Sequence, residues 1–360
     1  MFPRTVLTAL LATWVLAAPA LHGQDATQPE LTPDALFQDG VTNLAAKKFA
    51  EAEASFRRLR ALEPGNVRGV VGVGQTLMAQ AKFEAALQYL TAEVARDPTN
   101  AKLNLVLGDL AFQAGQMEIA TVRFQRALDL LRADPNAATF FVKRSSKRPP
   151  DSIKNPFEAA LDNFIGNDVT APGPTGIYFR LSEGFLRMGD LPRGVDALEN
   201  ARRLRPTDPA ILMNLGLLYE VGHDPNRALA RYRDVIKVQP DAVGALNNAA
   251  FLIAESNNGD LDEALRDAMH ANKLQPNSPE ITDTLGWVYF KRKELKDAFT
   301  IFAKLLQISP DKPVYREHMR ATVVAAGDTL PQSQQLLKAL GESPSEESNR
   351  ALTELLSTMK

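Results

Sequence analysis

The sequence predicts an all-α solenoid, a fold in which helix hairpins stack in a row. One observation is a pair of amphipathic segments that lie between Pro279 and Pro310 and are joined by a polar turn. In the first segment Leu285 and Tyr289 share one helical face, and in the second Phe302 belongs to an apolar stripe with three- and four-residue spacing. A single hairpin of this kind cannot bury its apolar faces, so it must stack on neighbours that repeat its pattern.

The second observation is that small residues recur at a fixed period. Gly40, Gly74 and Gly108 lie 34 residues apart, and the alanines that follow them keep the same spacing. Six sets of a small residue, an Ala and a Pro can be aligned: Gly40, Ala52, Pro64; Gly74, Ala86, Pro98; Gly108, Ala120, Pro135; Gly216, Ala228, Pro240; Ala250, Ala264, Pro276; and Gly286, Ala298, Pro310. In such a chain the length reflects the number of repeats and not the number of globular domains.

This pattern resembles the tetratricopeptide repeat. In that family a small residue lies midway along the first helix of each hairpin, an Ala lies in the second helix, and a Pro ends it. The resemblance implies a right-handed α-solenoid of about eight tetratricopeptide helix hairpins with a C-terminal capping helix. It also implies that the concave wall, which is built mainly by the first helices, binds an extended or helical peptide.

Residues 1–23 are predicted to be a secretory signal peptide. The apolar run Thr5–Ala18 follows a basic residue and is shorter than the ~20 residues needed to span a bilayer. Cleavage after Ala20 or Gly23 would start the mature chain in a polar leader, residues 24–32, and retention as a membrane anchor is the alternative. Because the sequence has no Cys, a lipid-modified Cys is excluded. We therefore expect an exported protein, periplasmic or secreted, with no membrane span in the mature chain.

Residues 33–135 are predicted to form three repeats, after which the 34-residue register is lost. We interpret residues 136–174 as an insertion or linker with a short helix over Asn155–Ile165. This segment also carries a basic run, which is a solvated loop in one interpretation and a partner-contacting arm in the other. The basic residues are Lys143, Arg144, Lys147 and Arg148.

Residues 175–340 are predicted to form five further repeats. The first of them is divergent, with Ser182 where the family has its Gly, and the last departs most, with Arg320 in the small-residue place. Terminal repeats commonly diverge because one of their faces meets water. Residues 341–360 are predicted to be a capping helix, whose apolar stripe consists of Leu352, Leu355, Leu356 and Met359.

Composition and motifs argue against chemistry. The chain has 41 basic and 43 acidic residues and a net charge of -2, so it has no excess charge to attract nucleic acid or anionic lipid. His223, His270 and His318 fall in different repeats without metal-ligand spacing, and no phosphate-binding loop or nucleophile motif is present. We expect no enzyme activity, no cofactor, no metal and no nucleic-acid partner. A homo-oligomer is not indicated, although the sequence leaves it open.

The groove candidates follow from the register of the first helices. The candidates are Phe37, Met78, Phe112, Phe179, Met213, Leu217, Asn247, Phe251, Asp283, Trp287 and Phe290. This wall is apolar with scattered acids, which favours an apolar or basic peptide or helix as ligand. It lacks the set of Lys, Arg and Asn residues with which family members grip a C-terminal carboxylate. In the alternative interpretation, many of these side chains pack against neighbouring helices or against the chain's own insertion.

The function favoured by the sequence is a non-enzymatic protein–protein interaction scaffold or assembly factor of the bacterial cell envelope, which binds a protein or peptide partner in its groove. The alternative is an accessory subunit that binds a carbohydrate or cell-wall polymer for an envelope enzyme or export system. In that case Trp287 and Phe290 would be stacking surfaces for sugar rings.

Overall fold

A computed structural model describes residues 32–133, 174–327, 332–341 and 343–358. The predicted signal peptide and nearly all of the predicted leader and insertion lie outside these residues. Every regular element of the described residues is an α-helix, which confirms the all-α class. None of the described helices combines the length and the apolar character needed to cross a membrane.

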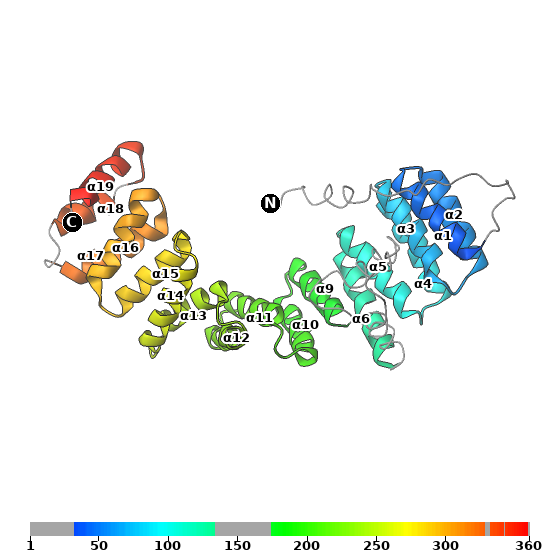
Figure 1. Cartoon of the computed structure of the whole chain (residues 1–360), viewed down its shortest axis with the longest axis horizontal. Coiled ribbons are helices and arrows are strands. Elements are labelled where there is room, and N and C mark those ends of the chain that lie inside the picture. The colour runs from blue at the N-terminus through cyan, green and yellow to red at the C-terminus, as the bar shows by residue number, and fades with distance from the viewer. Residues whose placement is uncertain (1–31, 134–173, 328–331, 342, 359–360) are drawn as a thin grey trace, which may run out of the picture. The chain divides into compact units, whose positions relative to one another are not determined.

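The helices fall into two compact units, Met1–Ala197 and Leu198–Lys360, with the boundary inside one helix, α10 (Leu191–Leu204). The first unit contains α1 (Pro33–Ala45), α2 (Phe49–Leu62), α3 (Val67–Ala79), α4 (Phe83–Arg96), α5 (Ala101–Gln113), α6 (Met117–Ala133) and α9 (Pro174–Arg187). The second contains α11 (Pro209–Val221), α12 (Pro225–Val238), α13 (Val243–Glu255), α14 (Leu261–Leu274), α15 (Pro279–Lys291), α16 (Leu295–Ile308), α17 (Pro313–Ala326), α18 (Ser333–Gly341) and α19 (Glu346–Thr358). Figure 1 labels these helices.

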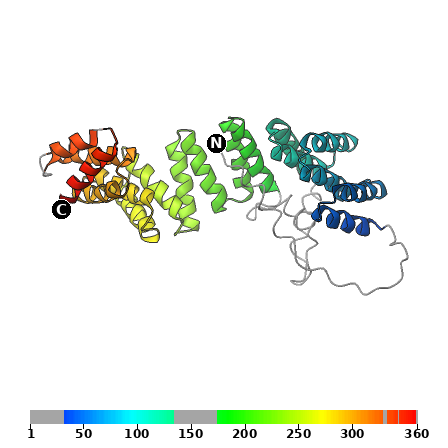
Figure 2. The ribbon, with the colours of Figure 1, turned by 90° about the horizontal axis from the view of Figure 1, so that it is seen from above.

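Within the first unit, consecutive helices pair as hairpins. The pairs are α1 with α2, α3 with α4, and α5 with α6, and each second helix also packs on the first helix of the next pair (Figure 2). Helix α9 packs on α6 in the same way, although residues 134–173 separate the two in the sequence. The stacking therefore resumes at α9 as the next first helix of the series.

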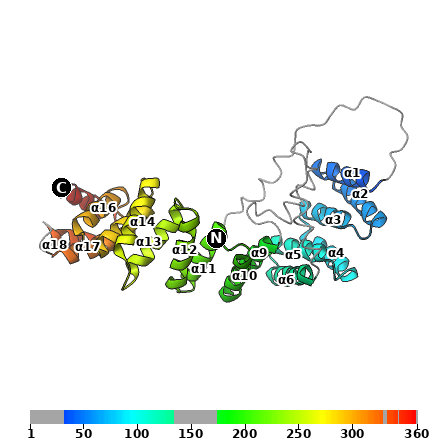
Figure 3. The same cartoon turned by 60° about the horizontal axis from the view of Figure 1, so that its bottom comes forward.

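The second unit repeats this arrangement. Its hairpins are α11–α12, α13–α14 and α15–α16 (Figure 3). Helices α12, α14 and α16 also pack on α13, α15 and α17, respectively. The short helix α18 takes the place of a second helix beside α17, and α19 contacts both α18 and α16. Repeating hairpins closed by a final helix are the fold that the sequence predicts.

Side-chain caps begin two of the first helices of the second unit. The Asp208 carboxylate accepts a hydrogen bond of 3.0 Å from the amide of Ala210, and Ser278 Oγ accepts one of 3.5 Å from the amide of Ile281. A Pro follows each cap at the first helical position, where its missing N–H costs nothing. These caps fix where α11 and α15 begin.

A close contact between a glycine and a large side chain holds the two helices of a hairpin together. A Cβ atom on Gly108 would lie 2.8 Å from Phe124 Cδ1, and one on Gly286 would lie 2.8 Å from Phe302 Cε1. Both phenylalanine rings are fully buried. The recurrent small residue of the first helix therefore leaves room for a large side chain of the second helix.

The final helix covers the open end of the last hairpins. Leu352 and Leu356 of α19 are buried in one cluster with Phe302 and Met319. Covering these side chains removes from water the apolar face that the last repeat would otherwise expose. This confirms the predicted capping helix.

The buried Arg316 ties α17 to this end of the chain. Its side chain donates to the carbonyl of Pro310 at 3.0 Å and to the carbonyls of Ala339 and Leu340 at 2.8 and 3.2 Å. Ala339 and Leu340 lie in the last turn of α18, whose carbonyl groups have no partner within the helix. The guanidinium of Arg316 satisfies these acceptors, and its positive charge interacts favourably with the negative end of the helix dipole.

We expect Gly108→Leu to lower the free energy of unfolding by ~1–2 kcal/mol, because overpacking against Phe124 outweighs the gain in helix propensity. Gly65→Leu is the matched control, since nothing lies within 4 Å of a Cβ atom at Gly65. Urea unfolding of the full chain, followed by circular dichroism, measures both. Equal losses in the two variants would contradict the packing account.

Candidate functional site

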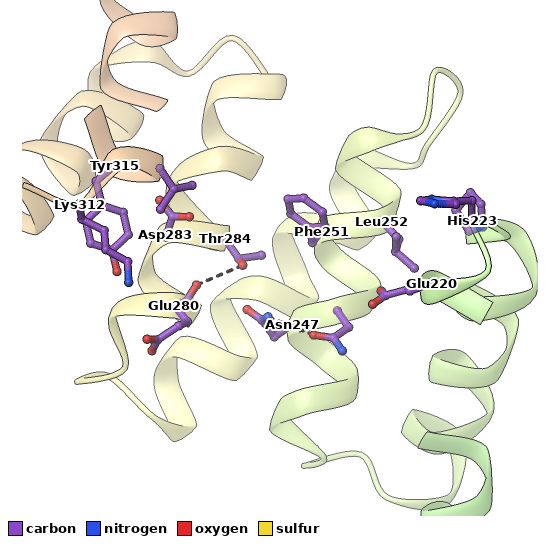
Figure 4. A pocket seen from close by; sticks show the side chains of 13 residues that line it. Glu220, His223, Asn247, Phe251, Leu252, Glu280, Asp283, Thr284, Lys312 and Tyr315 are labelled. Atoms are coloured by element: carbon purple, nitrogen blue, oxygen red, sulfur yellow. Dashed lines mark hydrogen bonds between the residues drawn. The ribbon is translucent and has the colours of Figure 1, made fainter. Parts of the chain in front are cut away.

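The first helices of the second unit line an open groove with a cavity volume of about 650 Å³. Figure 4 shows that side chains from α11, α13, α15 and the start of α17 face this space. The lining residues are Glu220, His223, Pro225, Asn247, Asn248, Phe251, Leu252, Glu280, Asp283, Thr284, Lys312, Val314 and Tyr315. Because each second helix packs between two first helices, the first helices keep one side free to form a common wall.

Phe251 is the aromatic side chain that the groove leaves most accessible, with 40% of its surface exposed. Its neighbours on the opposite side of α13, Ala250 and Ile253, are fully buried in the hairpin core. Helix geometry thus directs Phe251 away from the core and into the groove. Figure 4 shows its ring between α13 and α15.

Carboxylates are the commonest charged groups of the groove. Asp283 lies 2.9 Å from His318 Nδ1, and Glu280 accepts a hydrogen bond of 3.1 Å from Ser278 Oγ. Glu220, on α11, is half-buried and has no ion-pair partner among the described residues. Burial raises the pKa of Glu220 above its ordinary value. Lys312 is the lysine of the lining set.

The floor of the groove carries two neighbouring amides. Asn247 Nδ2 donates to Asn248 Oδ1 over 3.3 Å, and Asn247 Oδ1 is buried without a hydrogen-bond partner in the described part of the chain. The hydroxyl of Tyr232, a fully buried residue of α12, approaches Glu220 and Asn248 but meets the geometry of a hydrogen bond with neither. Buried polar atoms whose hydrogen-bonding capacity is not filled therefore lie beneath the groove.

The sequence-predicted residues of the second unit divide between the groove and its surroundings. Asn247, Phe251 and Asp283 line the groove. Met213 is half-buried and lies 3.2 Å from where a Cβ atom on Gly244 would be, so it packs at the beginning of α13. Leu217 is 41% exposed on α11 outside the groove lining.

Trp287 and Phe290 belong to a separate aromatic stack. The indole of Trp287 lies with its centroid 4.8 Å from the ring of Phe290 and 4.2 Å from the ring of His318. Its Nε1 donates to Glu255 over 2.6 Å, and the same carboxylate forms an ion pair of 2.8 Å with Lys291. These contacts join α13, α15 and α17 and give Trp287 a structural role.

In the first unit two of the four predicted candidates lie inside the hairpins. Phe37 and Phe112 are 1% and 7% exposed, with ring centroids 6.2 and 6.4 Å from those of Phe56 and Phe124. These two side chains fill the space between the helices of their own repeats, which leaves little of their surface for a ligand. Met78 and Phe179 are half-buried.

Lys312, Val314 and Tyr315 are lining residues that the sequence-based list does not include. Val314 and Tyr315 lie in the first turn of α17, the first helix of the last and most divergent repeat, and Lys312 is the residue that precedes this helix. The list ends at Phe290 because Arg320 breaks the small-residue pattern of this repeat. The position of α17 as the next first helix in the series was the available signal.

A buried carboxyl group of α5 lies beside an arginine of α9 in the first unit. Asp109 is 1% exposed, and one of its oxygens lies 2.8 Å from Arg180 Nη1. Neither oxygen accepts a well-aligned hydrogen bond from a described residue. Burial raises the pKa of Asp109 to about 7, and the charge of Arg180 opposes this shift.

The described residues contain no group of three or more His, Asp or Glu side chains that could hold a metal ion. The groove contains no pairing of a nucleophile with a base either, because its lining holds only carboxylates, amides, one His, one Lys, one Thr and one Tyr as polar groups. Its groups are suited to hydrogen bonding, apolar contact and charge complementarity.

Stacked hairpins whose first helices line a groove define the class of α-solenoid repeat proteins, which present extended binding surfaces. Residues 73–138 and 179–223 match the tetratricopeptide repeat family model, and this match supports assigning the repeats to that family. Tetratricopeptide repeats generally mediate protein–protein interactions.

The chain is similar to curated proteins of different organisms. The chain is 22% identical over 282 residues to the BBSome complex member BBS4 homolog of Drosophila melanogaster, a match that covers 78% of this chain and 52% of that protein. It is 30% identical over 138 residues to the TPR repeat-containing protein PA4667 of Pseudomonas aeruginosa, covering 38% of this chain and 23% of that protein. The chain thus spans about half or less of the length of these two relatives.

A solved structure supports the fold. The C-terminal part of a TPR repeat-containing protein from Cytophaga hutchinsonii superposes with a TM-score of 0.53 at 15% sequence identity, over 79% of this chain and 99% of that one. At this identity the likeness concerns the fold alone.

The raised pKa of Asp109 predicts a pH-dependent stability of the first unit. Between about pH 4 and 7 the native carboxyl keeps a proton that the unfolded one releases, so stability is highest at the low end of this window and falls as the pH rises through it. We expect the free energy of unfolding to fall by on the order of 2 kcal/mol from pH 5 to pH 7 through this group. Asp109→Asn should remove this contribution.

Urea unfolding at several pH values measures the effect. Glu118→Gln, at an exposed carboxylate of the same unit, is the control and should keep the slope of the parent protein. If Asp109→Asn keeps that slope as well, Asp109 is not the titrating group.

Proposed function

We propose that the protein is a non-enzymatic scaffold that binds a polypeptide segment of a partner protein in the groove of the second unit. The observation that carries this proposal is the 40% exposed Phe251 inside a groove of about 650 Å³. An accessible aromatic side chain inside a concave site offers apolar surface that a ligand can cover. Burial of such an anchor contributes about 1.5–3 kcal/mol to binding.

The groups around Phe251 suit a peptide. The amides of Asn247 and Asn248 offer donors and acceptors for a peptide backbone, and Leu252 and Val314 add apolar surface to the same groove. A segment that runs across α11, α13, α15 and α17 would contact four successive repeats. Several small contacts of this kind add up to specific binding although none is strong alone.

A place in the bacterial cell envelope is the second part of the proposal. It rests on residues 1–23, whose basic start, short apolar run and small residues have the pattern of a cleaved secretory signal. Intact-mass measurement of the protein recovered from its native cells tests this part. Loss of the first 20 or 23 residues supports export, and a full-length chain in the cytoplasm contradicts it.

The carbohydrate-binding alternative has less support. A sugar-stacking platform needs a free aromatic face, whereas Trp287 already stacks with Phe290 and His318 and has Lys291 Nζ 5.0 Å from its ring centroid. Polysaccharide binding by the purified protein, with loss on replacement of Phe251, would favour this alternative over a peptide ligand.

We expect Phe251→Ala to weaken capture of the partner by about tenfold or more, because the variant loses the aromatic anchor and little else. Crosslinking and affinity capture of the tagged full chain from its native cells, with the captured partner quantified, measures this loss. Met269→Ala is the matched control, since Met269 is 51% exposed on α14 and does not line the groove.

Both variants should keep the helical signal and the melting temperature of the parent protein. Equal capture by Phe251→Ala and the parent protein would show that the partner binds elsewhere.

A further inference from the structure

Glu220 has an unusual environment for a carboxylate of this groove. It is half-buried at the end of α11 and lies beside Asn248 and the buried hydroxyl of Tyr232. No Lys, Arg or His of the described residues forms an ion pair with it. A partly desolvated carboxylate without a cation partner is costly, and a ligand that supplies the cation would remove that cost.

The other charges of the groove are arranged differently. Asp283 has His318 as its partner, and Lys312 lies on the same side of the groove as Asp283 and Glu280 (Figure 4). His223 lines the groove near Glu220, but no hydrogen bond or ion pair joins its ring to the Glu220 carboxylate in the described part of the chain. Glu280 is exposed to water, so Glu220 is the half-buried carboxylate of the groove that lacks an ion-pair partner among the described residues.

The floor beside Glu220 adds a second, independent observation. The hydroxyl of Tyr232 belongs to a side chain with 0% exposure and has no hydrogen-bond partner of good geometry among the described residues. Asn247 Oδ1 is likewise buried and unpaired there. The Tyr232 hydroxyl and the Asn248 amide thus make the surroundings of Glu220 polar, and the Glu220 carboxylate itself is the group that a donor-rich cation would contact.

We propose that the groove selects a peptide segment in which a Lys or Arg lies next to an apolar residue, with the cation against Glu220 and the apolar side chain on Phe251. This inference rests on the proposed function and names the chemistry of the partner. Charge complementarity supports it, because three carboxylates and a single Lys line the groove. An acidic segment would meet repulsion at Glu220, Glu280 and Asp283.

A phage-displayed library of random short peptides, selected against the full chain, provides the test. We expect the enriched peptides to carry a Lys or Arg beside an apolar residue. Binding of a synthetic enriched peptide should weaken about tenfold in Glu220→Gln, which removes the charge and keeps the shape. Glu347→Gln, at an exposed position of α19 in the same unit, is the matched control and should leave binding unchanged.

A charge exchange separates direct recognition from a loss of folding. Glu220→Lys should reject the enriched peptide and should bind the version in which Glu replaces its Lys or Arg. A Glu220→Gln variant that binds like the parent protein, or enriched peptides without a cation, would overturn the inference. If these peptides still lose binding in Phe251→Ala, the proposed function survives.

If no peptide is enriched, or if binding is insensitive to Phe251→Ala, both the inference and the proposed function are wrong.

Discussion

The fold depends on one recurring contact, in which a glycine of the first helix accommodates a large side chain of the second helix sixteen residues later. Phe124 fills the space above Gly108, and Phe302 fills that above Gly286. In the second unit a Cβ atom on Gly216 would clash with the ring of Tyr232. Because these rings are fully buried against the glycines, this contact fixes the distance between the paired helices.

This contact also connects the core to the groove. Tyr232 occupies the core position that Phe124 and Phe302 occupy in other repeats, yet its hydroxyl continues beyond the ring toward Glu220 and Asn248. One residue thus packs a hairpin with its ring and places a polar atom beneath the groove. A Phe at this position would pack equally well, so the hydroxyl points to a role on the groove side.

Repeat spacing was sufficient to predict the hairpins, because the small residue, the Ala and the final Pro each have a direct steric purpose. The groove was only partly predictable. The register identifies which side of a first helix faces inward, and this places Asn247, Phe251 and Asp283 in the groove. It does not reveal which of these side chains pack against the second helix of their own hairpin, as Phe37 and Phe112 do. The register also does not predict contacts between side chains of different repeats, such as the stack of Trp287 of α15 on His318 of α17.

The central claim is that the first helices of the second unit form the binding surface. Amide hydrogen exchange of the full chain, with and without a saturating enriched peptide, tests it most directly because it reports on every helix at once. The account predicts slower exchange in α11, α13 and α15 and little change in α14 and in the first unit. Protection confined to the second helices, or to α1–α6, would contradict it.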